Sequence, residues 1–442
     1  MIESIYKNVK CCVKFGNDSV TESFNSTRGV RQGCQLSTIL FNMYVEDLAE
    51  CIGGNTHAPC IGKFDVPLLQ YADDLVILSE TPIGLTRALK QLDKFCSQWD
   101  LTVNTKKTKV IIFSNGNKLS KKFKWFSKGQ EIEIVNRIKY LGVNIAHNGK
   151  WNQQIEEVIN RGRKYITTIR SGVYRIGGNG TIDLMEKIFF SVIQPAMLYG
   201  CEVWGEGKKV EMIDSVIKSF AKELLGVSKG VPGEVALGEL GWMKIKYIIK
   251  KRQMLYYYKL KSCAERKLQQ ECLKYRKDKL KDEMKKLKID EIWEREENKK
   301  ALKAKLEQAI WEYQKEDWEE EVRDKRSLEL AGRLGFKKEG EEYVRWFEKE
   351  ERRSFTKFKL GNYIWESKKR DDGTRICCLC NGQENYNHIL KECIALKDQR
   401  DKLCDLDEGG IGIENLNGKN KTKLYNIIKF INNWEKIRKR TL

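Results

Sequence analysis

The sequence predicts an α+β fold over its first part, a mainly helical middle and a small cysteine-rich module near its C-terminal end. The first part contains short apolar runs typical of strands, and next to them a segment whose apolar residues are spaced as in a helix. The middle is rich in helix-forming residues, and cysteines gather late in the chain. A chain of 442 residues suits two to four such units. We divide it at residues 1–150, 151–260, 261–345 and 346–442.

Residues 64–78 predict a β-hairpin with an acidic tip. Two short apolar runs flank Ala72, Asp73 and Asp74, and each run is bounded as a buried strand would be. The acidic pair then lies at the turn between the strands.

The next elements alternate between helix and strand. Residues 82–99 predict a helix, because their apolar positions repeat every three or four residues. An apolar strand is expected over Val110–Phe113, and Ile132–Val143 predicts a second hairpin that ends at residues 139–142. This order favours an antiparallel sheet with helices packed on one face.

Residues 281–330 predict a long helix. The segment contains neither Pro nor Gly, and its 13 basic and 16 acidic residues make it slightly acidic. Opposite charges recur three and four positions apart, as on solvated helices. We interpret the segment as an exposed helix that joins two domains, and a helix that binds a partner is the alternative.

Two patterns lie near the C-terminal end. Residues 352–359 mix basic and aromatic side chains, which favours either contacts with nucleic acid or the edge of an amphipathic element. Beyond them, apolar residues at helical spacing predict a helix that packs its apolar face on the cysteine-rich region; they are Leu424, Ile427, Ile428, Ile431, Trp434 and Ile437.

The charge balance indicates a polyanionic partner. Lys and Arg exceed Asp and Glu by 82 to 62, a formal net charge of +20, and nucleic acid is the usual partner of such a chain. The longest apolar stretch, residues 188–204, is interrupted by Gln194, Pro195 and Glu202, so no membrane span is expected. The N-terminal residues lack the pattern of a secretion signal. We therefore expect an intracellular protein, nuclear or cytoplasmic, with reduced thiols.

Asp73 and Asp74 indicate one of two roles. Aspartate is common in turns, so a polar hairpin turn explains the pair without chemistry. The alternative is a metal site, because carboxylate oxygens suit Mg²⁺ and phosphoryl-transfer enzymes hold two such ions close together.

The C-terminal cysteines predict a zinc site. Cys377, Cys380, His388 and Cys393 form the pattern C-x2-C-x7-H-x4-C, and three thiolates with one imidazole suit tetrahedral Zn²⁺. Cys378 could replace Cys377 as a ligand, although two intervening residues is the commoner spacing. Buried free cysteines beside an unrelated histidine are the other explanation. Zinc knuckles commonly contact single-stranded nucleic acid.

An ordered series of motifs resembles the reverse transcriptase of non-LTR (LINE-type) retrotransposons. The series comprises residues 28–33 (Arg-Gly-Val-Arg-Gln-Gly), 71–74 (Tyr-Ala-Asp-Asp), 104–109 (Asn-Thr-Lys-Lys-Thr-Lys) and 139–142 (Lys-Tyr-Leu-Gly). Residues 199–205 (Tyr-Gly-Cys-Glu-Val-Trp-Gly) look like the region after the polymerase core, and the cysteine module resembles the C-terminal CCHC knuckle of these proteins. The resemblance implies a partial palm over residues 1–150, a helical thumb over 151–260, a charged helical linker and a zinc-knuckle domain.

The resemblance also implies roles for single residues. Asp73 and Asp74 would hold catalytic Mg²⁺, and Lys107 would lie near the incoming triphosphate. Tyr140, Leu141 and Gly142 would form the primer grip. The template and nascent base pair would be contacted by Arg28, Gly29, Arg31, Gln32, Gly33 and Tyr71. Element RNA and target DNA would be the partners.

Three departures from the family pattern bear on activity. Gln35 and Thr38 stand where the family has prolines, which softens that loop. A further metal-binding Asp would lie thirty to forty residues before Arg28, which is more than the 27 residues that precede it here. We therefore expect that this chain does not polymerise DNA by itself. A non-catalytic protein that binds RNA or DNA through basic surfaces and the knuckle is the alternative.

Overall fold

The computed structural model describes two compact units. One comprises residues 1–138 with 267–272, and the other comprises residues 139–266 with 273–442. Among the helices described, none is both long and apolar enough to cross a bilayer. The residues described are 2–7, 9–16, 19–26, 29–31, 33–53, 56–114, 123–175, 182–261, 267–274, 282, 284–285, 299–323, 332, 335–360, 368–370, 374–404, 416 and 420–441.

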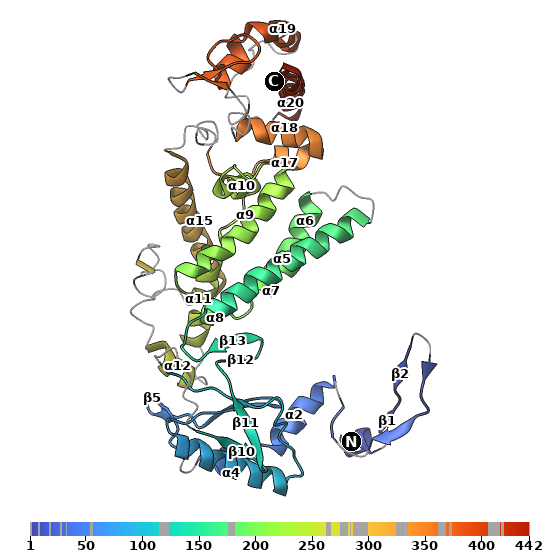
Figure 1. The fold of residues 1–442 in the computed structure, drawn as a ribbon, viewed down its shortest axis with the longest axis vertical. Helices are drawn as coiled ribbons and strands as arrows, with labels where there is room; N and C mark the ends of the chain where they lie inside the picture. The colour runs from blue at the N-terminus through green and yellow to red at the C-terminus, as the bar shows by residue number, and fades with distance from the viewer. Residues whose placement is uncertain are drawn as a thin grey trace. The chain divides into compact units, whose positions relative to one another are not determined.

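The first unit is a mixture of short strands and helices, which confirms the predicted α+β class. Its β-pairing is mostly antiparallel and local (Figure 1). Its elements are α1 (Ile2–Tyr6), β1 (Val9–Cys11), β2 (Lys14–Phe15), β3 (Ser19–Val20), β4 (Phe24–Ser26), α2 (Gln35–Tyr44), α3 (Leu48–Gly53), β5 (Cys60–Ile61), β6 (Phe64–Asp65), β7 (Leu68–Tyr71), β8 (Asp74–Ile77), α4 (Pro82–Gln98), β9 (Lys109–Val110), β10 (Trp125–Ser127) and β11 (Gln130–Ile134), followed later in the chain by α12 (Lys267–Lys274).

Helix α4 organises this unit, and its prediction is confirmed. Thr81 caps the helix by accepting a hydrogen bond from the Gly84 amide at 3.0 Å, and Pro82 occupies the first turn, where its missing N–H costs nothing. One part of its buried face packs with α3 and the β7–β8 hairpin, and another part packs with β9, β10 and β11. The buried residues are Gly84, Ala88, Leu89, Leu92, Phe95 and Cys96.

The strands differ from the prediction in two respects. The β7–β8 hairpin forms, but its strands are half-buried or exposed rather than buried. Residues 132–143 are not one hairpin, because β11 pairs with β10 and, in parallel, with β9. Residues 139–142, the expected end of that hairpin, instead belong to a hairpin in which β12 (Arg137–Tyr140) joins β13 (Val143–Ala146).

The second unit is mainly helical and contains one extensive apolar core. This core includes residues from Ile155 to Trp434, so the predicted C-terminal helix buries its apolar face as expected. Division of this unit into separate domains stays a prediction. Its elements after β13 are α5 (Asn152–Arg175), α6 (Ile182–Ile188), η1 (Phe189–Ile193), α7 (Gln194–Met197), α8 (Cys201–Trp204), η2 (Lys208–Val210), α9 (Glu211–Leu225), α10 (Gly233–Leu240), α11 (Ile245–Lys261), α15 (Lys299–Arg323), α17 (Tyr343–Trp346), α18 (Lys349–Lys359), β14 (Lys368–Lys369), β15 (Arg375–Ile376), η5 (His388–Glu392), η6 (Ile394–Leu396), α19 (Lys397–Cys404) and α20 (Lys421–Thr441).

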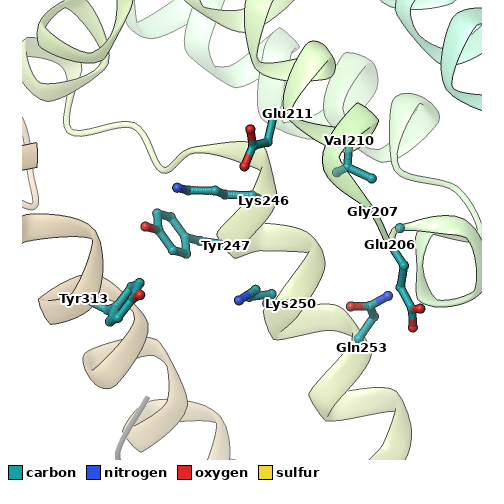
Figure 2. Close-up of a pocket in the computed structure, with 10 residues that line it drawn as sticks. Glu206, Gly207, Val210, Glu211, Lys246, Tyr247, Lys250, Gln253 and Tyr313 are labelled. Atoms are coloured by element: carbon teal, nitrogen blue, oxygen red, sulfur yellow. The ribbon is translucent and has the colours of Figure 1, made fainter. Parts of the chain in front are cut away.

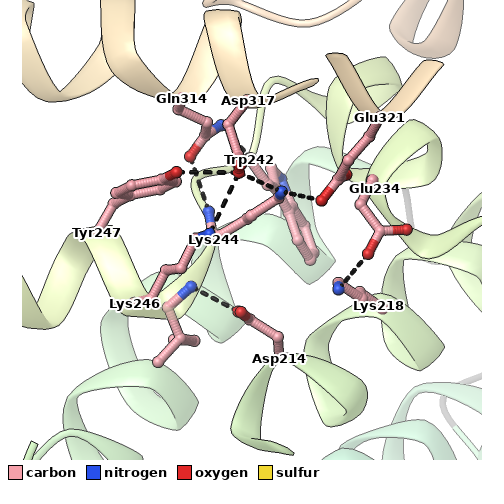
Figure 3. A network of polar contacts seen from close by, with 11 residues as sticks. Asp214, Lys218, Glu234, Trp242, Lys244, Lys246, Tyr247, Gln314, Asp317 and Glu321 are labelled. Carbon is pink, nitrogen blue, oxygen red and sulfur yellow. Dashed lines mark hydrogen bonds and ion pairs between the residues drawn. The ribbon is translucent and has the colours of Figure 1, made fainter. Parts of the chain in front are cut away.

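Helix α15 corrects the expectation of an exposed linker. It buries one residue in every four along a single face, namely Leu302, Leu306, Ile310, Gln314, Trp318 and Val322. Polar contacts add to this packing (Figure 3). The ammonium of Lys244, which is buried, lies 2.6 Å from Asp317 and 2.9 Å from Glu321, and the backbone amide of Lys244 donates to Gln314. The high charge of this helix therefore serves internal ion pairs as well as solvation.

Helix α18 decides between the two interpretations of residues 352–359. Phe355, Phe358 and Lys359 are almost fully buried, so these side chains are not available to nucleic acid, and the amphipathic alternative is correct. Lys359 lies 2.8 Å from Glu239 and 3.1 Å from Glu341. Burial opposes the charge on Lys359, but the two carboxylates outweigh burial and hold its pKa above the ordinary value.

Replacing Lys359 by Met should strongly destabilise the second unit. The change leaves the buried Glu239 carboxylate without its cation and Glu341 with Lys337 alone, which costs about 3–5 kcal/mol in the free energy of unfolding. Urea unfolding monitored by circular dichroism would measure this loss. Lys439→Met is the matched control, since Lys439 pairs with Glu435 at the surface and should matter by at most about 1 kcal/mol. Equal losses in the two variants would contradict the assignment.

Candidate functional site

The acidic hairpin places Tyr71, Asp73 and Asp74 together at one tip. Tyr71 pairs directly with Asp74 across the strands, and Ala72 and Asp73 form the turn. Ala72 adopts a positive φ of 51°, which is unusual for a residue with a side chain. Both carboxylates and the Tyr71 ring are exposed, so the tip presents its oxygens to solvent, where a hard cation can reach them.

The loop that contains Gly29 and Gly33, called here the glycine-rich loop, is fixed by the elements on either side of it. The guanidinium of Arg31 donates to the Ile5 carbonyl at 2.8 Å, and Ser37 in the first turn of α2 donates to the Arg31 carbonyl at 2.6 Å. Gly29 and Gly33 both adopt positive φ, the conformation for which glycine is best suited. Arg28 and Gln32 lie outside the described residues.

Lys107 lies in a turn just before β9. Its backbone amide donates to the Asn104 carbonyl at 3.1 Å and also contacts the Asn104 side chain at 3.2 Å, and its own side chain is exposed. Val110 of β9 and Ile77 of β8 belong to the same apolar cluster around α4. The turn and the acidic hairpin therefore rest on a common scaffold, although the structure puts their site residues on separate elements.

The turn between β12 and β13 is formed by Leu141 and Gly142. Both residues have positive φ, 46° and 82°, as a two-residue type I′ hairpin turn requires. Leucine tolerates this conformation poorly, so contacts around the hairpin must hold it. Tyr140, the third residue predicted for this element, precedes the turn in β12 and is half-buried.

Those contacts come from α5. The Glu157 carboxylate lies 2.9 Å from Lys139 at one side of the hairpin, accepts a short hydrogen bond from Asn144 at the other, and pairs with Arg161 on its own helix. The Asn144 backbone amide also donates to Gln154 at 2.9 Å. Hydrogen bonds from Lys139 and Asn144, and then from Arg161, lower the pKa of Glu157 to about 2.

The second candidate centre is the cysteine–histidine cluster. The sulfurs of Cys377, Cys380 and Cys393 and one ring nitrogen of His388 all lie within 4.8 Å of one another. Cys380 Sγ is 3.1 Å from His388 Nε2, and Cys377 Sγ is 3.9 Å from Cys393 Sγ. This donor set fits a tetrahedral zinc knuckle. Cys377, rather than Cys378, belongs to the cluster, which resolves the alternative left open by the sequence.

Local turns bring the four ligands together. The Cys377 amide donates to the Gly382 carbonyl at 2.8 Å, which folds the first two cysteines into a tight turn after β15. A Cβ on Gly382 would lie 2.9 Å from His388 Cε1, so a side chain there would displace the imidazole. Asn385 accepts a hydrogen bond from the His388 amide at 2.8 Å and so fixes the start of η5.

Without a bound cation the buried thiols of this cluster are protonated, so metal binding would release protons. Burial and then the neighbouring sulfur of Cys377 raise the pKa of Cys393 to about 12, and burial also raises the pKa of Cys377. Burial lowers the pKa of His388, so its imidazole is neutral at neutral pH and can donate a lone pair. A cation would compensate the charge of the thiolates that these distances bring together.

The cluster is continuous with the helical core. Tyr386, Ile389, Leu390 and Cys393 belong to the same apolar core as α5, α9 and α20. The Tyr386 hydroxyl donates to the Lys359 carbonyl at 3.4 Å, and its ring meets Phe358 edge to face. Metal binding at this position would therefore stabilise the end of a large core and not an isolated finger.

A pocket of about 250 Å³ lies between α11, α15 and the loop before α9 (Figure 2). Lys246 and Tyr247 both approach Asp317, at 3.2 Å and 2.9 Å, so these lining groups are already paired. The predicted catalytic and metal-binding residues do not line this pocket. We assign it no ligand.

Several residues that build these sites were not predicted from the sequence. Glu157 had no signal beyond its place on an amphipathic helix. Gly382 and Asn385 could have been recognised from their positions relative to the ligands. Gly382 stands two residues after Cys380, where a tight turn favours glycine, and Asn385 stands three residues before His388, where it can cap a helix.

The cluster should hold about one zinc ion per chain. Cys393→Ser removes a buried ligand and should abolish stoichiometric zinc, whereas Cys378→Ser should retain it because Cys378 lies outside the cluster. Metal analysis of the purified proteins would measure this. Zinc loss in both variants, or in neither, would show that the ligand set is wrong.

The contribution of Glu157 to stability should depend on pH. A carboxyl whose pKa falls from 4.5 to about 2 on folding contributes fully above pH 4.5, and the contribution is lost as the pH falls through about 2. Glu157→Gln should therefore lower the urea midpoint at neutral pH, and the difference from wild type should shrink below pH 4.5. Glu156→Gln, one residue earlier and exposed, is the control. A pH-independent difference would refute the ion-pair explanation.

Comparisons with known proteins agree with the order of the motifs. Residues 1–145 match the family model described as reverse transcriptase (RNA-dependent DNA polymerase). A transposon-derived protein of Caenorhabditis elegans is 29% identical over 171 residues, which is 36% of this chain and 57% of that protein. The Pol polyprotein of a type-2 retrotransposable element from Drosophila melanogaster is 32% identical over 146 residues, 30% of this chain and 13% of the relative. A type-1 element Pol polyprotein from Nasonia vitripennis is 33% identical over 124 residues, 26% of this chain and 12% of the relative.

The chain thus spans a little over half of the nematode relative and much less of the insect polyproteins. The match covers the acidic hairpin, the glycine-rich loop and the turn before β9. Residues 1–145 are thus similar to reverse transcriptases, and the chain is similar over part of its length to Pol polyproteins of retrotransposable elements.

Proposed function

We propose that this chain contributes to RNA-templated DNA synthesis by a non-LTR retrotransposon, and that taken alone these 442 residues bind nucleic acid without polymerising it. The observation that carries the proposal is the exposed pair Asp73 and Asp74 at the tip of a hairpin, within the segment that matches reverse transcriptases. In this proposal residues 1–150 are a partial palm, residues 151–260 a thumb, and the cysteine cluster a zinc knuckle.

Asp73 and Asp74 are the type of ligand that Mg²⁺ prefers, but two carboxylates are too few to hold two ions. Two exposed carboxylates on a rigid hairpin are suitable ligands for a hard cation. Such ions, when bound, would activate a primer 3′ hydroxyl and offset charge on the leaving pyrophosphate. Two ions need more fixed negative charge than Asp73 and Asp74 supply, and the resemblance places a further Asp upstream of residue 28. Polymerisation therefore requires a carboxylate in addition to this pair.

The other residues have roles that need no metal. The exposed ammonium of Lys107 can balance the charge of a triphosphate. The type I′ turn of Leu141 and Gly142, clamped by Glu157, gives a rigid edge against which a primer strand can lie. The excess of 20 positive charges supports binding of a nucleic-acid backbone.

Primer extension with the purified chain tests catalysis. An RNA template annealed to a DNA primer, with Mg²⁺ and deoxynucleotides, should show no extension above that of Asp73→Asn. Asp65→Asn, an exposed carboxylate on the neighbouring β5–β6 hairpin, is the matched control. Extension by wild type and Asp65→Asn that disappears in Asp73→Asn would show that the pair is sufficient for catalysis and would overturn the proposed inactivity.

Fluorescence anisotropy with the same primer–template tests binding. The affinity should fall steeply as salt rises, because lysines and arginines displace counterions from the phosphates. No binding at low salt would refute the proposed function.

A further inference from the structure

We propose that Tyr199 is a nucleic-acid contact that extends the Leu141–Gly142 turn into a larger binding surface. This inference rests on the proposed function, since it takes that turn as the place where a primer strand lies.

Tyr199 is exposed but rigidly anchored. More than half of its surface, 54%, is accessible, although Leu198 and Cys201 are completely buried. The indole of Trp204, also buried, donates to the Tyr199 carbonyl at 2.9 Å. Gly200 turns the chain sharply with a positive φ of 68°. An exposed aromatic ring on a fixed backbone loses little entropy when it binds a ligand.

The ring lies directly beside the turn. A Cβ built on Gly142 would come within 3.1 Å of Tyr199 Cε1, and one built on Gly200 would come within 2.9 Å of Val143 Cγ2. Both glycines are therefore needed for close approach of the two segments. The ring edge and the backbone of the turn form one continuous surface.

Cations hold the backbone just before Tyr199 and lie on the hairpin beside it. Arg161 donates to the Ala196 carbonyl at 3.3 Å and Arg252 to the Leu198 carbonyl at 3.1 Å, so guanidinium groups hold both of the carbonyls that flank Met197 just before Tyr199. Lys139, paired with Glu157, is exposed on the hairpin side. An aromatic face with nearby cations matches the chemistry of a nucleic-acid strand, which offers bases for stacking and phosphates for charge contacts.

The variants Tyr199→Ala and Tyr199→Phe test the inference. Affinity for a primer–template with a recessed 3′ end should fall about tenfold in Tyr199→Ala, because base stacking on one aromatic ring is lost. Tyr199→Phe keeps the ring and should bind like wild type. Tyr313→Ala, a half-exposed tyrosine on α15, is the matched control and should also bind like wild type.

Two further measurements make the outcomes distinguishable. Circular dichroism and zinc content verify that each variant is folded. If Tyr199→Ala does not fold, ultraviolet crosslinking of the wild-type chain to the primer–template takes the place of the affinity measurement. A crosslink at Tyr199 is then expected. Unchanged affinity in a folded Tyr199→Ala, or no crosslink at Tyr199, would overturn the inference while the proposed function stands. No binding by wild type would overturn both.

Discussion

The buried cation Lys359 joins segments of the helical unit that are far apart in the sequence. Lys359 ends α18 inside the core, between Glu239 of α10 and Glu341 before α17. A buried charge is stable only where its partners are fixed, so this ion group ties α10 to two segments that lie more than one hundred residues later in the chain. Tyr343 donates to Glu239 and completes the group. Tyr386 then connects the Lys359 backbone to the cysteine cluster.

The β12–β13 turn and the cysteine cluster are also held in place by residues that lie outside them in the chain. Neither the β12–β13 turn nor the cysteine cluster is large enough to have a core of its own. The turn is held by α5 through Glu157, and the cluster is held by apolar residues that it shares with α9 and α20. Each element is thus fixed by a scaffold that is buried nearby, which is how precise contacts are best supported.

The sequence was most informative where local rules apply. Helix α4, the acidic turn and the Cys377–Cys393 ligand set follow from spacing and capping over a few residues. The sequence was less informative where the burial of a residue depends on partners far away in the chain. Nothing near Lys359 in the sequence indicates Glu239, so the basic and aromatic run left two interpretations open, and only the burial of Phe355, Phe358 and Lys359 decides between them. Likewise, the burial of Trp318 on α15 depends on partners such as Phe336, which the charge pattern of the helix does not reveal.

The position of α20 in the core constrains how the protein can be made. Ile428 and Ile431 are fully buried in the core that begins with Ile155 of α5, and Trp434 meets Phe358 edge to face. While the ribosome still holds α20, the helices already synthesised lack one wall and keep apolar side chains in water. This core can therefore close only after α20 has left the ribosome, whereas residues 1–138 can pack around α4 as they emerge. A premature stop codon before residue 421 would leave a chain that chaperones and proteases recognise as unfinished.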